Sequence, residues 1–395
     1  MRSLKADPAT VRSQNRRLIL DLLRTEGPLS RIQLAEATGL STASITIVTA
    51  ELIGDGWISE QGTTQASSGG GRRPILLNIN YDSHFAIGIK IRQERIDAGL
   101  TDLSTRVLAH TTLPVTSTAP GDILRDLHTV CTRLLDERGL TFDRLLGIGL
   151  ALSGIVDFTT GTAVQTPQLG WFDVPIAEMA SAHLGVPVWA DNDVNAYAVA
   201  EHLFGHAKKH QNVLVVTAGR GVGAAFILDG QVFRGRGGGS GEFGHNVIVD
   251  GGRLCTCGQH GCLEAYTAEP ALISQYAEHR PDLGGMTADL IAEHARDGNE
   301  DARALLHDAG TLLGRHVSYL VNTVDPELIL FGGEASRLGE AYLAPLQATI
   351  RDLAFAGRAR NLPFIVDPWT DNTFTPWVRG AASLAVQRAF DLGIV

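Results

Sequence analysis

Apolar residues near the N-terminus recur at helical spacing in three short segments that glycines separate. Residues 13–26 place four large apolar side chains on one face, and two shorter segments with the same spacing occupy residues 30–39 and 40–53. Two apolar runs with strand character follow at residues 57–59 and 75–79, on either side of a tip rich in serine and glycine. Two short helices joined by a tight turn and followed by paired strands predict a winged helix-turn-helix.

From residue 85 onward, apolar strands and helical stretches alternate. A strand, a turn and a second strand at 85–102 are similar to the segment at 213–233, and this weak internal repeat predicts two related α/β lobes. Helices are expected at about 121–138 in the first lobe and about 301–323 in the second. An Ala-rich final helix, about 376–390, is expected to pack back on the body.

The composition is that of an ordinary globular protein, with 44% hydrophobic and 19% charged residues. A chain of 395 residues is expected to hold two or three domains, each with its own core. The sequence contains no run of 18 apolar residues, so we expect no membrane span. The N-terminal residues are polar and charged where a secretory signal would be apolar, which predicts a cytoplasmic protein.

Charge is spread unevenly along the chain. The first 80 residues hold nine Lys and Arg against seven Asp and Glu, whereas the remainder holds 24 against 36. A mildly basic head on an acidic body favours a head that binds nucleic acid and a body with another task.

The third helix of the head would enter double-stranded DNA, and it carries neither Arg nor Lys. Ile45, Val48 and Leu52 are expected to face the core. The small and hydroxyl side chains left to face DNA are Ser41, Thr42, Ala43, Ser44 and Thr46. Such side chains contact thymine methyls and phosphates better than guanine edges, so we expect an A·T-rich operator. A winged helix used for protein contacts is the alternative.

Arginines occur at two further places in the head. Arg72 and Arg73 lie on the tip between the two strands, where they are placed to meet phosphates or the minor groove. Arg12, Arg16 and Arg17 lie on the first helix, where positive charge suits contact with the DNA backbone. A solvated helix face is the alternative for these three.

Three of the four cysteines, Cys255, Cys257 and Cys262, lie within eight residues, and His245 lies ten residues before the first of them. One imidazole and three thiolates form the four-coordinate set that Zn²⁺ takes in closed structural sites. Glycines within the loop supply the tight turns that such a short segment needs. We therefore predict a structural zinc site, and the alternatives are three neighbouring thiols without an ion or a disulfide with one thiol left over.

Polar side chains also gather where a strand of the first lobe ends. The segment V-P-V-W-A-D-N-D ends in Asn192 and Asp193, and a helix follows at once. Polar groups at the end of a strand, against a helix N-terminus, are where open α/β sheets bind ligands. Two more carboxylates, Glu242 and Glu264, bracket the predicted zinc loop. The alternatives are a helix cap for Asp193 and solvated loop positions for the two glutamates.

Four motifs make the chain resemble the ROK family of repressors and sugar kinases, and its NagC/XylR repressor type in particular. They are E-F-G-H at 242–245, C-T-C-G-Q-H-G-C-L-E at 255–264, A-D-N-D-V-N-A at 190–196 and L-S-T-A-S-I-T at 40–46. The resemblance covers nearly the whole chain and implies a winged helix followed by a two-lobed actin-like or hexokinase-like domain of the α/β class. The implied domains are the head with its wing and linker at 1–80, a first lobe at 81–194, a second lobe with the zinc loop at 195–375, and a final helix at 376–392 that packs on the first lobe.

The resemblance also implies roles for individual residues. Zinc would be bound by His245, Cys255, Cys257 and Cys262. A sugar would be bound by Asn192, Asp193, Glu242, His245 and Glu264, with backbone near Gly154. His245 would serve both sites, with one ring nitrogen on zinc and the other toward the sugar. One departure is Gln168, which stands where the family pattern leads us to expect Asn, and it leaves the identity of the sugar open.

Kinases of this family open their first lobe with a D-x-G-G-T loop that lets backbone approach phosphate and supplies a carboxylate near Mg²⁺. Here Lys90 stands in place of that Asp, and Arg92-Gln93-Glu94 replace G-G-T. Without the two glycines the backbone cannot approach phosphate closely, and Glu94 would repel it. The glycines at 219–223 and 332–333 remain, but such turns also serve to link strands.

We therefore predict a sugar-responsive transcriptional repressor that is not an enzyme, assembled as a homodimer or homotetramer. A sugar or sugar derivative in the cleft between the lobes would shift the winged helices off the operator, or on to it. The alternatives are a sugar kinase and a DNA-binding protein whose pocket no longer binds sugar.

Overall fold

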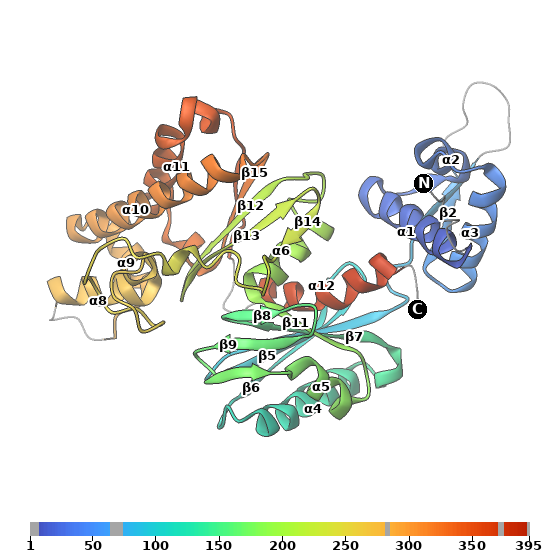
Figure 1. Ribbon diagram of the computed structural model, residues 1–395, viewed down its shortest axis with the longest axis horizontal. Coiled ribbons are helices and arrows are strands. Elements are labelled where there is room, and N and C mark those ends of the chain that lie inside the picture. Colours follow the sequence, from blue (N-terminus) through green and yellow to red (C-terminus); the bar gives the residue numbers. More distant parts are fainter. Residues whose placement is uncertain (1–7, 64–73, 281–284, 370–374, 393–395) are drawn as a thin grey trace, which may run out of the picture.

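The computed structural model describes residues 8–63, 74–280, 285–369 and 375–392, which form a small head and two lobes (Figure 1). The predicted α/β class with an N-terminal winged helix-turn-helix is confirmed. Among the described helices, none alone is long and apolar enough to cross a membrane, and one head pair bent by 119° passes that test on length and composition only.

The head is a winged helix with three helices and a three-stranded sheet in the order β1-β3-β2. Its elements are α1 (Pro8–Glu26), β1 (Leu29–Ser30), α2 (Arg31–Thr38), α3 (Thr42–Gly54), β2 (Ile58–Thr63) and β3 (Ile75–Ile79). Ser30 and Gln33 form a capping box at the start of α2. Gly39 ends that helix with a φ of 70°, a left-handed conformation that glycine adopts without strain. The turn between α2 and α3 is therefore built as the sequence predicts.

The first lobe is a five-stranded sheet in the order β11-β7-β4-β5-β6. Its strands are β4 (Phe85–Ile91), β5 (Arg95–Asp102), β6 (Val107–Pro114), β7 (Leu145–Leu152) and β11 (Val188–Asn192). The connecting elements are α4 (Pro120–Glu137), η1 (Phe142–Arg144), the small sheet of β8 (Ile155–Asp157), β9 (Thr162–Thr166) and β10 (Trp171–Val174), and α5 (Ile176–Leu184). The apolar faces of α4 and α5 pack on this sheet in one core.

The second lobe repeats this arrangement, with five strands in the order β14-β13-β12-β15-β16. Its strands are β12 (Val213–Ala218), β13 (Val222–Leu228), β14 (Gln231–Phe233), β15 (Leu328–Gly332) and β16 (Phe364–Val366). In both sheets three antiparallel strands continue into two parallel ones. The expected internal repeat is therefore confirmed at the level of topology.

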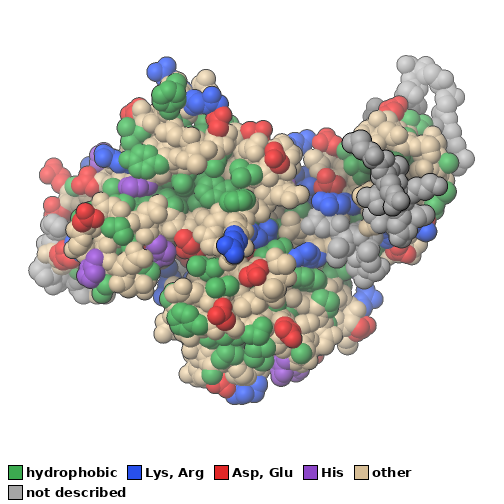
Figure 2. Space-filling model, in the orientation of Figure 1, with side chains coloured by type: hydrophobic (Ala, Val, Ile, Leu, Met, Phe, Trp, Pro, Cys, Tyr) green, Lys and Arg blue, Asp and Glu red, His purple; other side chains and the backbone are tan. Residues whose placement is uncertain are grey.

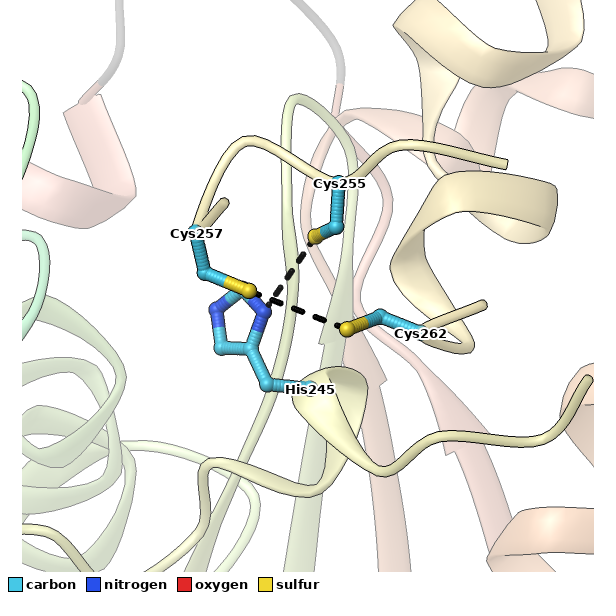
Figure 3. Close-up of side chains that lie close together, drawn as sticks. All are labelled: His245, Cys255, Cys257 and Cys262. Carbon is cyan, nitrogen blue, oxygen red and sulfur yellow. Dashed lines mark hydrogen bonds between the residues drawn. The ribbon is translucent and has the colours of Figure 1, made fainter. Parts of the chain in front are cut away.

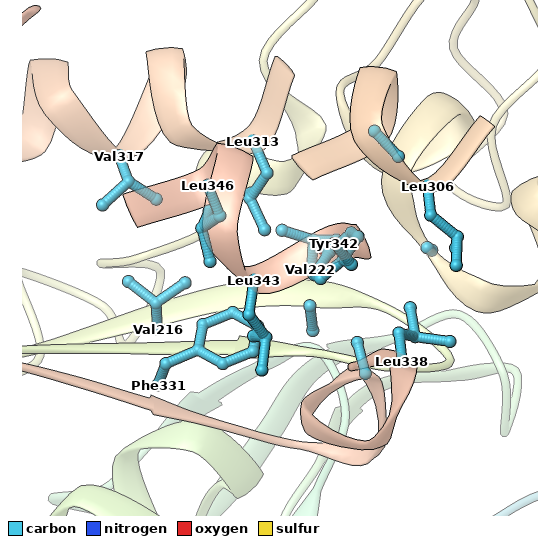
Figure 4. Packing of buried hydrophobic residues seen from close by; sticks show 14 of the residues in the cluster. Val216, Val222, Leu306, Leu313, Val317, Phe331, Leu338, Tyr342, Leu343 and Leu346 are labelled. Carbon is cyan, nitrogen blue, oxygen red and sulfur yellow. The ribbon is translucent and has the colours of Figure 1, made fainter. Parts of the chain in front are cut away.

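Helices cover the second sheet and enclose the largest core. They are α7 (Glu264–Thr267), α8 (Glu269–His279), α9 (Ala288–Arg296), α10 (Glu300–Val324) and α11 (Glu340–Leu353), with the short turns η2 (Phe243–His245), η3 (Glu334–Leu338) and η4 (Phe355–Arg360). Figure 4 shows Val216 and Phe331 of the sheet facing Leu313 and Val317 of α10 and Leu346 of α11. Each such buried side chain contributes about 1.5–3 kcal/mol to folding, so this lobe is a rigid support for the loop at its edge.

Two helices connect the lobes and the head. Helix α6 (Asp193–Phe204) follows β11 directly, and α12 (Thr375–Leu392) packs on the first-lobe sheet and points toward the head (Figure 1). A Cβ atom at Gly88 or Gly149 would run into α12 backbone, so these glycines allow the close approach. Residues of α12, among them Val386 and Phe390, share one core with α1 of the head. The boundaries of the three domains stay a prediction.

On the face of the molecule seen in Figure 2, acidic and basic side chains are interspersed over the two lobes. The formal net charge of −10 is therefore not gathered into one acidic patch on that face.

Candidate functional site

Tight turns bring the four predicted metal ligands together at the edge of the second lobe. His245 lies at the end of η2, and the chain returns to it through isolated bridges that pair Val247 with Cys262 and Leu254 with His260. Gly261 has a φ of 85°, and a Cβ atom there would run into the Val249 carbonyl. The loop can therefore close only with glycine at this position.

The ligand atoms of His245, Cys255, Cys257 and Cys262 all lie within 4.8 Å of one another (Figure 3). Cys257 Sγ lies 3.7 Å from Cys262 Sγ, and His245 Nδ1 lies 3.5 Å from Cys255 Sγ. A tetrahedral zinc ion with Zn–S bonds of about 2.3 Å has S···S edges of about 3.8 Å. The four side chains therefore fit one tetrahedral metal ion, and the alternative of a disulfide is wrong because all four cysteines are free.

Two thiols of this cluster are buried and the third, that of Cys257, is partly buried, which suits a closed site. Cys255 is 5% exposed and Cys262 is fully buried. Burial raises the pKa of the Cys262 thiol to about 12, and the neighbouring thiols of Cys257 and Cys255 add to this effect. Only a bound cation would make thiolates favourable in such surroundings, and a metal ion supplies that charge.

The second ring nitrogen of His245 points to a carboxylate. His245 Nε2 lies 3.8 Å from Glu242 Oε2, so the imidazole lies between the cysteines and Glu242. Burial raises the pKa of Glu242, and the negative charges of Asp193 and Glu264 raise it further. The negative charges of Asp193 and Glu264 therefore act on Glu242, although the three carboxylates come from different elements.

Glu264 is held firmly at the start of α7. It is 8% exposed, its Oε2 accepts the Val222 amide at 3.0 Å, and its Oε1 accepts the Thr256 hydroxyl at 2.8 Å. The alternative for Glu264, a loop carboxylate exposed to solvent, is wrong because the side chain is buried and bonded.

The first lobe contributes the N-terminus of α6. Asn192 is the N-cap residue, and its Oδ1 accepts the amides of Val194 at 2.8 Å and Asn195 at 3.3 Å. Its Nδ2 donates to the carbonyl of Gly154 at 2.9 Å. Gly154 has a φ of 106°, and a Cβ atom there would run into the Gln165 carbonyl, so this position requires glycine. The structure thus places Gly154 and Asn192 in contact, as expected of two parts of one site.

Lys90 is a residue of this site that the sequence analysis did not assign to it. Its side chain is 1% exposed, and its ammonium group pairs with Asp193 and donates to Ser153 Oγ at 3.0 Å. Ser153 in turn donates to Asp193 Oδ2 at 2.9 Å. Burial lowers the pKa of Lys90, and the charge of Asp193 opposes that effect. The available signal was a lysine inside the apolar strand I-K-I, which requires a buried partner.

We call Asn192, Asp193, Glu242, His245 and Glu264 the polar set. A second group of charges lies beyond Lys90, and we call Arg92, Glu94, Arg220 and Glu334 the ion-pair set.

Each acid of the ion-pair set has an arginine partner. Glu94 pairs with Arg220 across the two lobes, and Arg92 Nη2 lies 3.8 Å from Glu334 Oε1. The Glu334 carboxylate occupies the space that a Cβ atom at Gly219 would need. The remaining glycine turn at 219–223 therefore packs against the protein's own carboxylate.

The recognition helix of the head, α3, has the expected core face. Ile45, Val48 and Leu52 are buried, which confirms that prediction. Of the residues predicted to face DNA, Ser41, Thr42, Ala43 and Thr46 are exposed, and Ser44 is half-buried. Arg72 and Arg73 lie outside the described residues.

Ile47, which is 59% exposed on α3, was not among the residues predicted to face DNA. It lies on one face with Ala43, Thr46 and Ala50, at the spacing of three to four residues that could have identified it. Thr46 Oγ1 donates to the Thr42 carbonyl at 2.8 Å, so this hydroxyl is used within the helix. The exposed face of α3 therefore presents mainly methyl groups.

Arginines of the head pair with its own acids. Arg12 pairs with Glu51, Arg16 Nη2 lies 2.7 Å from Asp55 Oδ2, and Arg31 pairs with Glu60. Contact between these arginines and DNA phosphates would require that these pairs open.

Comparisons with known proteins agree with this division into head and body. A sequence model of the ROK family matches residues 86–388, and a model of winged helix-turn-helix DNA-binding domains matches residues 12–59. The chain is 30% identical over 369 residues to the xylose repressor of Caldicellulosiruptor bescii. The aligned region covers 90% of this chain and 92% of that repressor.

Two solved structures show the same fold. A ROK family transcriptional regulator, a homologue of the E. coli MLC protein, matches with a TM-score of 0.83 and 26% identity over 96% of this chain and 97% of its own. A ROK family glucokinase from Streptomyces griseus, solved with glucose and AMPPNP, matches with a TM-score of 0.67 and 29% identity over 77% of this chain and 99% of its own. The regulator thus spans nearly all of the chain, and the glucokinase about three quarters of it.

Proposed function

The chain belongs to the ROK family, and on this premise we propose that it is a sugar-responsive, DNA-binding transcriptional repressor without kinase activity. One observation carries the proposal: the buried ion pair of Lys90 and Asp193, in a chain that also has a winged helix-turn-helix. In a sugar kinase the carboxylate at Asp193 would act as the general base. Here Lys90 holds that carboxylate, and Glu334 fills the place next to the remaining glycine turn. Such a site can bind a sugar but cannot bring phosphate to it.

The polar set, with backbone near Gly154, is the proposed sugar site. Carboxylates accept hydrogen bonds from hydroxyl groups, and the amide of Asn192 both donates and accepts. Glu242 and His245 have side chains that are 31% and 29% exposed, which leaves their polar atoms accessible. The similarity to a xylose repressor over most of the chain supports a sugar as the effector.

Zinc is the metal that we propose for His245, Cys255, Cys257 and Cys262. Three thiolates and one imidazole are a preferred zinc set, and the spacing of the sulfur atoms matches a tetrahedron around it. Zinc would fix His245 through Nδ1 and so direct Nε2 toward Glu242 and the sugar. Its role would be structural, because four protein ligands leave no open position.

For the DNA site, we propose that the exposed face of α3 reads thymine methyl groups in the major groove of an A·T-rich operator. The methyl groups of Ala43, Thr46 and Ile47 support this reading, because apolar groups contact the thymine methyl favourably. Replacing Ile47 by Ser should weaken binding to the operator several-fold and leave binding to unrelated DNA unchanged, since a lost base contact costs about 1–3 kcal/mol. Gel shifts with both DNAs test this, and an equal loss on both would contradict it.

The response requires two heads, so we propose a homodimer or homotetramer in which the lobes set the distance between the winged helices. DNA half-sites lie about one helical turn apart, and a small change of lobe arrangement would remove the fit. Light scattering of the purified protein measures the assembly, and a monomer at operator-binding concentrations would contradict this part of the proposal.

Calorimetry with D-xylose, D-glucose and N-acetyl-D-glucosamine tests the function directly, followed by gel shifts on DNA upstream of the protein's own gene. We expect one sugar to bind and to change the affinity for that DNA. Binding of no sugar would leave a DNA-binding protein without an effector. Turnover of ATP with any of the three sugars would show that the protein is a kinase.

A further inference from the structure

Helix α6 runs from the proposed sugar site to the DNA-binding head. It has 12 residues and so spans about 18 Å. Asn192 is its N-cap and Asp193 its first residue, and their side chains bond to Gly154, Ser153 and Lys90. Its last turn holds His202 and Leu203, whose carbonyls face the head. One helix therefore has a ligand-binding end and an end that meets the head.

Helix α6 is packed on all sides, so it moves as one piece. Its residues from Val194 to Glu201 are all buried. A Cβ atom at Gly380 of α12 would lie 2.8 Å from the Tyr197 amide nitrogen, which shows how closely α12 and α6 approach. A densely packed helix transmits a displacement at one end to the other because its surroundings cannot absorb it by compression.

Arg24 of the head caps the C-terminus of α6. Its Nη1 donates to the Leu203 carbonyl at 2.5 Å and lies 3.4 Å from the His202 carbonyl. The last carbonyls of a helix have no partner within the helix and carry partial negative charge, so a guanidinium group satisfies both. Asp21 fixes the same guanidinium group from within α1, with Asp21 Oδ1 at 2.5 Å from Arg24 Nη2. Arg24 is 5% exposed, so this contact is shielded from water.

The other contacts between head and body are less directional. Ile19 and Leu23 of α1 pack against Ala382, Val386 and neighbouring apolar residues of α12. Apolar contacts of this kind allow sliding, because the hydrophobic effect depends on buried area and not on direction. Lys209 and Glu26 form an exposed ion pair at 3.6 Å, a type that contributes little. Among the residues that the structure describes, Arg24 is thus the head side chain that donates hydrogen bonds to the end of α6.

We propose that α6 transmits occupancy of the sugar site to the head, and that Arg24 is the positioning residue through which it acts. A sugar that engages Asn192 and Asp193 would change the bonds that hold the first turn of α6. The displaced carbonyls at its end would then carry Arg24 and α1 with them. This inference rests on the proposed function, because it needs both a sugar site at α6 and DNA binding by the head.

The experiment compares the coupling between sugar and DNA in full-length variants. The probe is the one of D-xylose, D-glucose and N-acetyl-D-glucosamine that binds the wild type, and the readout is the ratio of DNA Kd values with and without it. In Arg24→Met we expect this ratio to fall from at least about fivefold to less than about twofold, with the sugar Kd little changed. Arg24→Lys keeps one charged donor and should restore part of the ratio.

Arg125→Met is the matched control. Arg125 is an exposed helical arginine that pairs with Asp122 three residues before it, as Arg24 pairs with Asp21. It should keep the wild-type ratio, because it contacts neither α6 nor the head. A wild-type ratio in Arg24→Met would overturn the proposal, and so would an equal loss of coupling in Arg125→Met.

A further variant covers the case in which Arg24→Met does not fold. Asp21→Asn leaves Arg24 in place and removes the carboxylate that orients it, so it should lower the ratio partly, and a wild-type ratio there would overturn the proposal. Failure of the proposed function looks different. A wild type that binds no sugar, binds no DNA or shows a ratio of one contradicts the function itself, whatever Arg24 does.

Discussion

The polar set and the ion-pair set lie in the same part of the molecule and use the same kinds of side chain, but only in the ion-pair set does each carboxylate face an arginine. The side chain of Glu242 is 31% exposed, whereas that of Glu334 is 9% exposed. Within the ion-pair set each carboxylate faces an arginine, so its hydrogen-bonding capacity is used by the protein. We therefore expect a ligand at the polar set, where Glu242 keeps accessible oxygens, and none at the buried pair of Arg92 and Glu334.

The two sets also depend on different supports. On the second-lobe side, the polar set lies on a loop whose His245, Cys255, Cys257 and Cys262 could hold a metal ion. The ion-pair set is held by strand ends and by η3, and none of its residues belongs to that loop. Removal of the metal should therefore disturb the polar set and leave the ion-pair set in place.

Loss of the metal is expected to have the largest effect. In Cys257→Ser one thiolate is missing, so the protein should bind well under one zinc per chain, and sugar affinity should fall by about 100-fold or more because His245 and Glu242 lose their support. Metal analysis and calorimetry measure the two quantities. Hydrogen exchange should rise at residues 242–264 and stay low in α6.

Cys131→Ala is the control for this variant. Cys131 is a buried cysteine of α4 outside the cluster, so its loss should leave zinc and sugar binding intact. If Cys257→Ser keeps its sugar response without zinc, the metal loop does not organise the polar set.

The Lys90–Asp193 pair marks the border between the two sets, and breaking it is expected to have the next largest effect. Asp193→Asn leaves the ammonium group of Lys90, which is 1% exposed, without its negative partner. An uncompensated buried charge costs about 3–5 kcal/mol of unfolding free energy. The double variant Lys90→Met, Asp193→Asn should recover most of this loss, since no buried charge remains. Urea denaturation measures the three proteins, and equal midpoints for the single and double variants would show that the pair is not buried.

The sequence predicts the parts of this site that are local. The four residues that could hold a metal ion lie within 18 residues, so their spacing alone predicts the cluster, and the core face of α3 follows from its periodicity. Lys90 and Asp193 are 103 residues apart, and Arg24 and Leu203 are 179 apart. No local pattern selects such partners, because only the packed fold brings them together.

The elements that were not expected are also those with weak local patterns. The strand β6 lies at a sheet edge, and β8, β9 and β10 have three to five residues each. Helix α5 has nine residues. Segments this short carry too few positions for periodicity to identify, so their structure depends on the contacts that the large sheets provide.

Glu269 borders the ion-pair set. Its titration is expected to make the free energy of unfolding depend on pH, with an effect of intermediate size. Burial raises the pKa of Glu269 to about 7, and the negative charge of Glu334 adds to this, against Arg337. Between its unfolded pKa of 4.5 and about 7, the folded protein holds a proton that the unfolded chain does not. The stabilisation that comes from this proton is therefore fully present below pH 4.5 and is lost as the pH rises through about 7. It amounts to at most about 3 kcal/mol of unfolding free energy.

The variant Glu269→Gln should remove this dependence. It should gain stability relative to the wild type as the pH rises from about 5 to 8, because it has no carboxylate to charge. Urea unfolding of both proteins across that range measures the difference. Parallel curves would show that Glu269 is not buried among the negative charges of Glu334 and Asp289.

The Glu94–Arg220 pair should have the smallest effect, although it joins the two lobes. Its side chains are 48% and 54% exposed, so water and salt screen their attraction. Arg220→Met should therefore change the unfolding free energy by less than about 1 kcal/mol. Arg92→Met is the matched comparison, since Arg92 is 7% exposed and faces Glu334 and Asp97, and it should cost several times as much. Equal costs in urea denaturation would mean that the exposed pair holds the lobes together as firmly as the buried one.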